Sequence, residues 1–332
     1  MSSPARDDHS LLGAGAGADG ELDDDAPPEE DDGGTLLSAG ELAELDRLRR
    51  HLALRTATEG QGRQASRRRG QSPEFVDHRP YAPGDDLRRL DWNVLARSNA
   101  TVIKRYRAEE EAAVRIALDV SGSMATGRPV KWKLAKRIAA AIGYVALADG
   151  ERAQLATMSA RGVEAFSPKR GRGQFGAIRN RLERVRTDDP TGDTQAIAPE
   201  ATMIELLSRI RRAGVLVIVT DALPGNGDLD AWPRAIGRAR AGGHDVRMVQ
   251  ILSPEDLDPP WDGDLALIDA ETGASVDVTF DAEARDQYAR RLEALVGALR
   301  EGCRRSKAAY ARARSDEEVI AVVRRLAGGG ID

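Results

Sequence analysis

The chain has 332 residues, of which 41% are hydrophobic, a formal net charge of −5 and a single cysteine. This length allows one large domain or two ordinary ones, and one cysteine excludes an intramolecular disulfide, which is typical of a reducing compartment. The acidic start does not match a signal peptide, and no apolar run reaches the roughly 18 residues of a membrane span. We therefore expect a soluble cytoplasmic protein.

The first part of the chain changes abruptly in charge. Residues 1–36 are acidic and contain too little apolar surface to offset the entropy of ordering, so we expect a disordered tail. Ser38 and Glu41 form a capping-box pattern, which predicts a helix with an apolar stripe that includes Leu42. We expect this helix to dock on the body of the protein, with docking on a partner as the alternative. Residues 61–70 are strongly basic, and such basic runs are common in nucleic-acid-binding proteins. We expect instead a loop that contacts acidic residues, because the whole chain is acidic and the nearby aromatic residues are scattered.

Residues 74–97, EFVDHRPYAPGDDLRRLDWNVLAR, carry a high density of charges of both signs around Trp92. Such charges beside a tryptophan predict arginine–carboxylate pairing rather than a plain solvated face. A strand is expected at Val102–Tyr106. We place the helix that starts after Ser38, this charged segment and the strand in one N-terminal subdomain, residues 37–112.

Strands and helices alternate from residue 113 to residue 303. Short apolar runs predict buried strands, and apolar residues at helical spacing predict the helices between them. Because this alternation is typical of parallel sheets with crossover helices, we expect an α/β fold, a doubly wound and mostly parallel sheet. After the strand that begins at Ala113, the expected strands are Arg152–Met158, Val163–Phe166, Val215–Thr220, Asp245–Leu252 and the hairpin Leu265–Ile268 with Val276–Phe280. The expected helices are Lys131–Ala148, Gln174–Arg186, Ile197–Arg212, Leu229–Ala241 and Ala282–Cys303.

Residues 304–332 are expected to form a C-terminal extension of that domain. A last strand is predicted at Tyr310–Arg314. Ser315 and Glu318 then match the capping-box pattern at the start of a final helix.

Polar side chains follow two of the predicted core strands at the point where each strand ends. Asp119, Ser121 and Ser123 come directly after the first apolar run, and Asp221 comes directly after the run VLVIVT. Open α/β sheets bind their ligands at the carboxyl ends of the strands, and carboxylate and hydroxyl oxygens suit Mg²⁺ or Ca²⁺. The loop before the second run supplies Thr194. On the first stretch alone, an equally simple interpretation is that Ser121 and Ser123 cap the next helix.

Asp-x-Ser-x-Ser, then Gly-x-Thr, then an apolar strand that ends in Thr-Asp resembles the metal-ion-dependent adhesion site (MIDAS) of von Willebrand factor A domains. The resemblance implies a Mg²⁺ ion, or Mn²⁺ or Ca²⁺ in its place, surrounded in part through water by Asp119, Ser121, Ser123, Thr194 and Asp221. Thr191 lies in the same loop as Thr194, and the Gly-x-Thr spacing favours Thr194.

A second set of residues, upstream of that pattern, resembles a bacterial family called domain of unknown function 58. The most specific part of its signature is matched by Gly84, Asp85, Asp86, Arg88, Asp91, Trp92 and Arg97. The resemblance covers roughly residues 60–320 and implies a von Willebrand factor A-like domain, which we place at residues 113–303. It also implies a role beside a MoxR-type AAA+ ATPase, and no catalytic activity is established for the family.

We expect a metal-dependent protein–protein interaction module that is the partner of such an ATPase in the assembly or maturation of other proteins. An acidic side chain of the ATPase or its client would complete the shell of the metal ion. The alternatives are a structural module without metal and a Mg²⁺-dependent, phosphatase-like hydrolase. We expect no enzyme, because no general base is evident in the motif and Ser121 stands where a phosphatase would carry its second aspartate. The sequence also has no nucleophile elbow, P-loop or zinc-protease motif.

Overall fold

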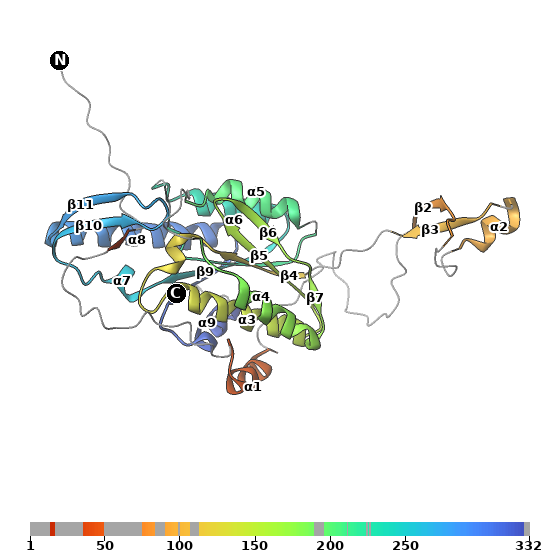
Figure 1. Ribbon diagram of the computed structural model, residues 1–332, viewed down its shortest axis with the longest axis horizontal. Helices are drawn as coiled ribbons and strands as arrows, with labels where there is room; N and C mark the ends of the chain where they lie inside the picture. The colour runs from red at the N-terminus through yellow and green to blue at the C-terminus, as the bar shows by residue number, and fades with distance from the viewer. Residues whose placement is uncertain are drawn as a thin grey trace, which may run out of the picture. The chain divides into compact units, whose positions relative to one another are not determined.

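The computed structural model describes residues 14–16, 36–49, 75–83, 90–98, 100–106, 113–188, 196–210, 212–223, 225 and 227–328. The chain divides into two compact units (Figure 1): residues 1–57 with 112–332, and residues 58–111. The larger unit contains a central sheet and a smaller three-stranded sheet, and the second unit contains a two-stranded sheet.

The central sheet is mostly parallel, with β4 and β8 at its middle. In the strand order β12-β9-β8-β4-β5-β6, the chain runs outward from the β4–β8 pair in both directions, which is the doubly wound topology. Antiparallel pairing occurs at the edge, where β6 and β7 pair with β5. The strands are β4 (Ala113–Asp119), β5 (Arg152–Ser159), β6 (Gly162–Ala165), β7 (Lys169–Arg170), β8 (Val215–Thr220), β9 (Asp245–Leu252) and β12 (Ala309–Arg314).

Helices cover both faces of this sheet (Figure 1). Val114, Ile116 and Leu118 of β4 face one layer of helices, α1, α3, α4 and α9, whereas Leu216 and Ile218 of β8 face the other, α5, α6 and α8. Successive strand residues point to opposite faces, so every residue of β4 and β8 is buried. The helices are α1 (Ala39–Leu48), α3 (Lys131–Ala148), α4 (Phe175–Arg184), α5 (Pro199–Arg209), α6 (Ala231–Ala241), α8 (Ala282–Arg305) and α9 (Val319–Ala327).

The expected fold class, a doubly wound α/β sheet, is confirmed. α3, β8 and β9 have the predicted bounds, and the other predicted elements of residues 113–303 differ from the observed ones by a few residues at their ends. Within the described residues, no helix combines the length and the apolar character that a bilayer crossing requires.

Helix α1 docks on the body of the protein, as we expected, and it belongs to the sheet unit. The predicted capping box between Ser38 and Glu41 forms. Leu45 is fully buried in the larger core, and Arg137 of α3 forms an ion pair with Glu41. Sequence patterns show that a helix is amphipathic without showing which surface covers its apolar stripe.

The predicted C-terminal extension is an integral part of the sheet unit. β12 pairs in parallel with β9 along its whole length, and α9 covers one face of the sheet. The capping-box prediction for α9 was wrong, because its N-cap is Glu318 and no side chain caps it. Ser315 instead continues the strand pairing, since its N–H donates to the carbonyl of Leu252 at 2.9 Å.

A smaller hairpin sheet follows the C-terminal end of β9 in the chain. The predicted hairpin forms from β10 (Gly263–Asp269) and β11 (Ser275–Phe280), and it follows the short helix α7 (Pro254–Leu257). β1 (Ala14–Ala16) pairs antiparallel with β10 and lies within the tail that we expected to be disordered. Apart from β1 and Leu36, the prediction for residues 1–36 falls outside the described residues.

The second unit carries the family-signature residues that the structure describes. β2 (Phe75–Pro80) pairs antiparallel with β3 (Val102–Tyr106), and α2 spans Trp92–Ser98. Asp91 accepts from the N–H groups of Asn93 and Val94 and contacts His78 Nε2 at 2.8 Å, so it both caps α2 and ties it to β2. Trp92 is exposed. Gly84, Asp85, Asp86 and Arg88 lie outside the described residues.

The buried side chain of His244 should make the stability of the fold sensitive to acid. It is 4% exposed, and its Nδ1 has no hydrogen-bond partner among the described residues. Burial, with a smaller effect of the Arg115 charge, lowers its pKa to about 4. Because the unfolded state takes up a proton first, this group contributes stability above about pH 6.5, and the contribution is lost as the pH falls towards 4.

We expect the wild type to lose about 3 kcal/mol relative to His244→Gln between pH 7 and pH 4. Urea unfolding of both proteins across that range measures the difference. A difference that does not change with pH would contradict the assignment of this effect to His244.

Candidate functional site

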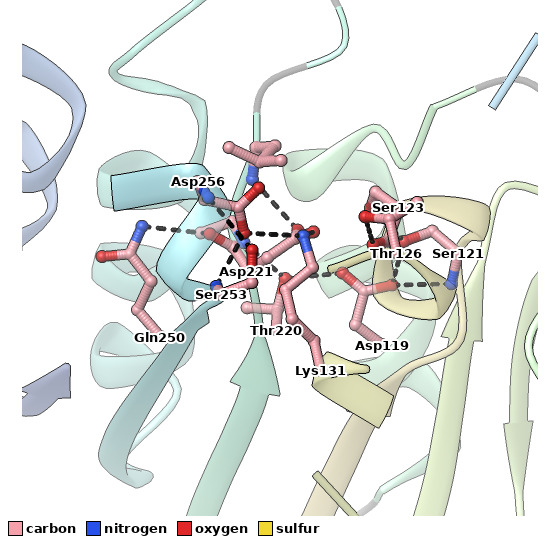
Figure 2. Close-up of polar contacts among 12 residues, drawn as sticks. Asp119, Ser121, Ser123, Thr126, Lys131, Thr220, Asp221, Gln250, Ser253 and Asp256 are labelled. Atoms are coloured by element: carbon pink, nitrogen blue, oxygen red, sulfur yellow. Dashed lines mark hydrogen bonds and ion pairs between the residues drawn. The ribbon is translucent and has the colours of Figure 1, made fainter. Parts of the chain in front are cut away.

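The end of β4 holds three of the predicted site residues together (Figure 2). Asp119 Oδ1 accepts from the N–H of Ser121 at 2.9 Å and from its hydroxyl at 2.6 Å. The hydroxyls of Ser121 and Ser123 are 3.1 Å apart. Neither the short 3₁₀ helix Gly122–Ala125 nor α3 is capped by a side chain, so these two serines do not serve as helix caps.

The end of β8 meets the end of β4 through a direct side-chain contact. The Thr220 hydroxyl donates to Asp119 Oδ2 at 2.5 Å and accepts from the N–H of Ala222 at 2.8 Å. Ala222 has a positive φ of 59°, which turns the chain sharply after the strand. Asp221, 1% exposed, accepts from the N–H of Leu223 at 3.2 Å. The two predicted aspartates thus lie at the ends of adjacent parallel strands, at the switch point of the sheet.

A buried lysine lies beside Asp221 (Figure 2). Lys131 Nζ is 2.8 Å from Asp221 Oδ2 and 3.2 Å from Asp256 Oδ2, and the lysine side chain has no exposed surface. Burial acts to lower the pKa of the ammonium, but the charges of the two aspartates outweigh it and hold that pKa above its ordinary value. Lys131 therefore stays charged and neutralises part of the acidic cluster.

Local structure holds each partner of Lys131 in place. Asp256 is fixed by a reciprocal capping box with Ser253 at the start of α7. Gly127 has a φ of +89°, and a Cβ there would lie 2.4 Å from Ser253 Cβ, so the loop before α3 can approach α7 only with glycine at this position. Gln250 donates to the carbonyl of Asp221 at 3.0 Å. The backbone that carries Asp221 is thereby tied to β9.

The acidic charge of the cluster exceeds the charge of its one lysine. Burial, and then the nearby charge of Asp221, raise the pKa of Asp119 to about 6. Burial, and then the charges of Asp119 and Asp221, raise the pKa of Glu271, in the turn between β10 and β11, to about 7 against the opposing effect of Ser123. These shifts indicate a negative potential that a cation would relieve.

The structure brings together Asp119, Ser121, Ser123 and Asp221, whereas Thr194 lies outside the described residues. Within the described part of the chain, no group of three or more His, Cys, Asp or Glu side chains is arranged to hold a metal ion by itself. Any cation here would therefore use hydroxyl groups beside the two aspartates. Of the signature residues, Asp91, Trp92 and Arg97 belong to the other compact unit.

Sequence analysis did not identify Lys131, Asp256 or Glu271 as site residues. Lys131 begins a predicted helix, where a lysine usually points to solvent, and only its complete burial reveals its role. The sequence does contain a signal for Asp256, because Ser253 and Asp256 have the spacing of a capping box. Glu271 lies in a hairpin turn, and nothing in its local sequence indicates which surface the turn contacts.

The strand order and parallel register define the central domain as a doubly wound α/β domain, with a polar, acidic cluster at its switch point. The chain belongs to the family described as Protein of unknown function DUF58, whose model matches residues 77–295. An uncharacterized protein of Mycobacterium tuberculosis (strain H37Rv) is 31% identical over 224 residues, which are 67% of this chain and 68% of that protein.

Two solved structures match part of this chain. The conserved hypothetical protein BatB from Bacteroides thetaiotaomicron has 15% identity and a TM-score of 0.39, over 66% of this chain and 97% of that chain. The SpRpn10 VWA domain has 12% identity and a TM-score of 0.38, over 66% of this chain and 96% of that chain.

The buried lysine leads to a prediction about stability. Lys131→Met leaves two carboxylates without their shared cation, and we expect a loss of about 3–5 kcal/mol in the free energy of unfolding. Lys133→Met, on the exposed side of the same helix, should change it by less than about 0.5 kcal/mol. Urea unfolding measures both changes. Equal effects of the two substitutions would show that the ion pairs of Lys131 contribute little to the free energy of unfolding.

Proposed function

We propose that this protein is an interaction module that holds a divalent cation at the ends of β4 and β8 and uses it to bind an acidic side chain of a partner. The observation that carries the proposal is the cluster of Asp119, Asp221 and two serine hydroxyls, buried together at the switch point of the sheet. This is the place where open α/β sheets bind their ligands. The proposal gives the site a binding role and no catalytic step.

The charge of the cluster supports a cation. The cluster contains the carboxyl groups of Asp119, Asp221 and Asp256 and one ammonium, that of Lys131, which pairs with Asp221 and Asp256 and leaves Asp119 without a cationic partner among the described contacts. Hard oxygen donors of this kind match Mg²⁺, Mn²⁺ or Ca²⁺. Asp119, Ser121, Ser123 and Asp221 would hold the ion, with Thr194 as a further predicted ligand. Bound there, the ion would supply a positive charge with a coordination position that an external carboxylate can occupy.

A basic cleft beside the cluster suits an acidic partner. The cleft, with a volume of about 440 Å³, is bordered by Val120, which lies between Asp119 and Ser121. Its acidic lining residues are Glu164, Asp188 and Glu205, and its arginines are Arg161, Arg181, Arg184, Arg186 and Arg209. The excess of arginine favours a segment that carries more than one carboxylate.

The family resemblance suggests the identity of the partner. We propose a MoxR-type AAA+ ATPase or its client, with this chain acting in the assembly or maturation of other proteins. The single cysteine is buried, and burial raises the pKa of the Cys303 thiol to about 12, so it stays a protonated thiol in the cytoplasmic setting that we propose.

A second candidate function follows from Lys131. Its ammonium already contacts Asp221 and Asp256, and it could replace the metal as the charge that holds the two loops together. In that case the domain is a structural scaffold without a metal ion. The two candidates differ in whether a divalent ion stabilises the protein.

Metal binding can be measured through stability. We expect Mg²⁺ at 100 times its dissociation constant to raise the free energy of unfolding by about 2.7 kcal/mol. Asp119→Asn should lose this increase while the metal-free protein stays as stable as the wild type, because the substitution removes a buried charge. Asp277→Asn, on the exposed strand β11, is the matched control and should keep the increase.

Calorimetric titration with Mg²⁺ and Mn²⁺ gives the affinities directly. If the wild type shows neither heat of binding nor a shift in stability, the cation proposal fails and the scaffold function remains.

Partner binding should depend on the same residues. With Mg²⁺ present, we expect the wild type and Asp277→Asn to capture a MoxR-type ATPase from the same genome. Capture should fall about ten-fold or more with EDTA or with Asp119→Asn, because the bridging ion is lost. Equal capture under all of these conditions would rule out a metal bridge.

A further inference from the structure

A second cleft continues the basic cleft that borders Val120. It has a volume of about 500 Å³ and is lined by residues of α4, β5, β6 and β7, elements that Figure 1 labels. Four residues line both clefts: Glu164, Phe166, Arg181 and Arg184. The two clefts are therefore parts of one groove, which starts next to the candidate cation site and continues along α4.

The groove carries more positive charge than its own carboxylates neutralise. Arg161 pairs with Asp188 at 3.0 Å, and Arg209 pairs with Glu205 at 2.6 Å. Of the carboxylates that line the groove, only that of Glu164 remains for the other basic lining residues, which are Lys169, Arg181, Arg184 and Arg186. An acidic ligand would gain from charges that are already in place.

Arg181 lies in the middle of the groove, where its guanidinium is held against an aromatic ring. Its Cζ is 3.7 Å from the centre of the Phe166 ring, so the planar group lies over the aromatic face. The N–O distance to Glu164 is 3.6 Å, which is longer than a hydrogen bond. Contact with the ring occupies a face of the guanidinium and leaves the N–H groups on its edge for a carboxylate of another molecule.

Beyond Arg181 the lining of the groove becomes more apolar. The apolar residues of the second cleft are Ala153, Leu155, Ala165, Phe166, Ala177 and Ile178. A ligand that fits both clefts has carboxylates at one end and an apolar side chain at the other. A peptide segment can combine the two, whereas a nucleic acid carries a negative charge on every unit.

We propose that this groove binds an extended segment of the partner, with a carboxylate on the edge of the Arg181 guanidinium and an apolar side chain in the second cleft. The inference rests on the proposed function, because the segment belongs to the partner whose carboxylate binds the cation. Contacts in the groove themselves require no metal ion. The partner is thereby defined further, as a protein in which an acidic stretch adjoins an apolar residue.

A synthetic peptide tests the acidic part. Fluorescence anisotropy measures the affinity of a labelled run of glutamates that ends in two leucines, with Mg²⁺ present. Arg181→Gln should weaken binding about ten-fold, because charge-assisted hydrogen bonds are lost. Arg181→Lys should weaken it similarly, because an ammonium keeps the charge and lacks the planar edge.

Arg179→Gln is the matched control. Arg179 is an exposed residue of the same helix, pairs with Glu183 at 3.6 Å and lines neither cleft. Because exposed ion pairs of this kind contribute little, the variant should bind the peptide within about two-fold of the wild type. Thermal unfolding checks that each variant is folded.

A second peptide, in which serines replace the leucines, tests the apolar part. We expect the wild type to bind it about five-fold more weakly, because less apolar surface is buried. Ala177→Gln places a polar side chain in the second cleft and should remove the difference between the two peptides.

The outcomes separate the groove from the cation. If Arg181→Gln weakens peptide binding equally in Mg²⁺ and in EDTA, the groove is supported even where the cation proposal fails. If EDTA weakens binding and Arg181→Gln has no more effect than Arg179→Gln, the groove is overturned and the cation site stands. Tighter binding of an oligothymidylate of equal charge would overturn the assignment to a peptide.

Discussion

Two carboxylates, Asp119 and Asp221, are buried side by side where β4 and β8 end, and the surrounding structure depends on how their charge is compensated. A buried carboxylate is costly unless hydrogen bonds or a cation offset the loss of water. Thr220 and Ser121 donate to Asp119, whereas Lys131 pairs with Asp221. The same contacts join the two central strands, so the polar cluster also ties β4 to β8 at their C-terminal ends.

This requirement explains features that otherwise look unrelated. Lys131 lies at the start of α3 and reaches Asp256 in α7, so one ammonium connects the first crossover helix to the loop after β9. Gly127 permits the close approach of those two segments. Gln250 continues the network into β9, where its Oε1 accepts from the Tyr310 hydroxyl of β12 at 2.7 Å. Four of the central strands thus contribute to the support of one site.

Local patterns were enough to predict most of the larger unit, and they failed where an outcome depended on distant contacts. α3, β8 and β9 were predicted with the observed bounds, because the apolar residues of α3 follow helical spacing and those of β8 and β9 form short runs typical of buried strands. The capping box at Ser38 formed, whereas the one predicted at Ser315 did not. A capping box needs the N–H of its serine, and the N–H of Ser315 donates to the carbonyl of Leu252 instead. The helix after Ser38 was predicted correctly and docks on the body of the protein as expected, but its amphipathic pattern did not show that Leu45 packs in the core beside α3.

The sequence by itself determined the doubly wound fold, the family and the position of Asp119, Ser121, Ser123 and Asp221 at strand ends, because strand period and chain direction place those residues at one edge of the sheet. Only the tertiary structure decided how their charge is balanced. Lys131 and Glu271 reach the cluster from a helix start and a hairpin turn, and the packing of separate elements brings them there. Burial and the neighbouring carboxylates then shift their pKa values, and both depend on the assembled layers rather than on any local pattern.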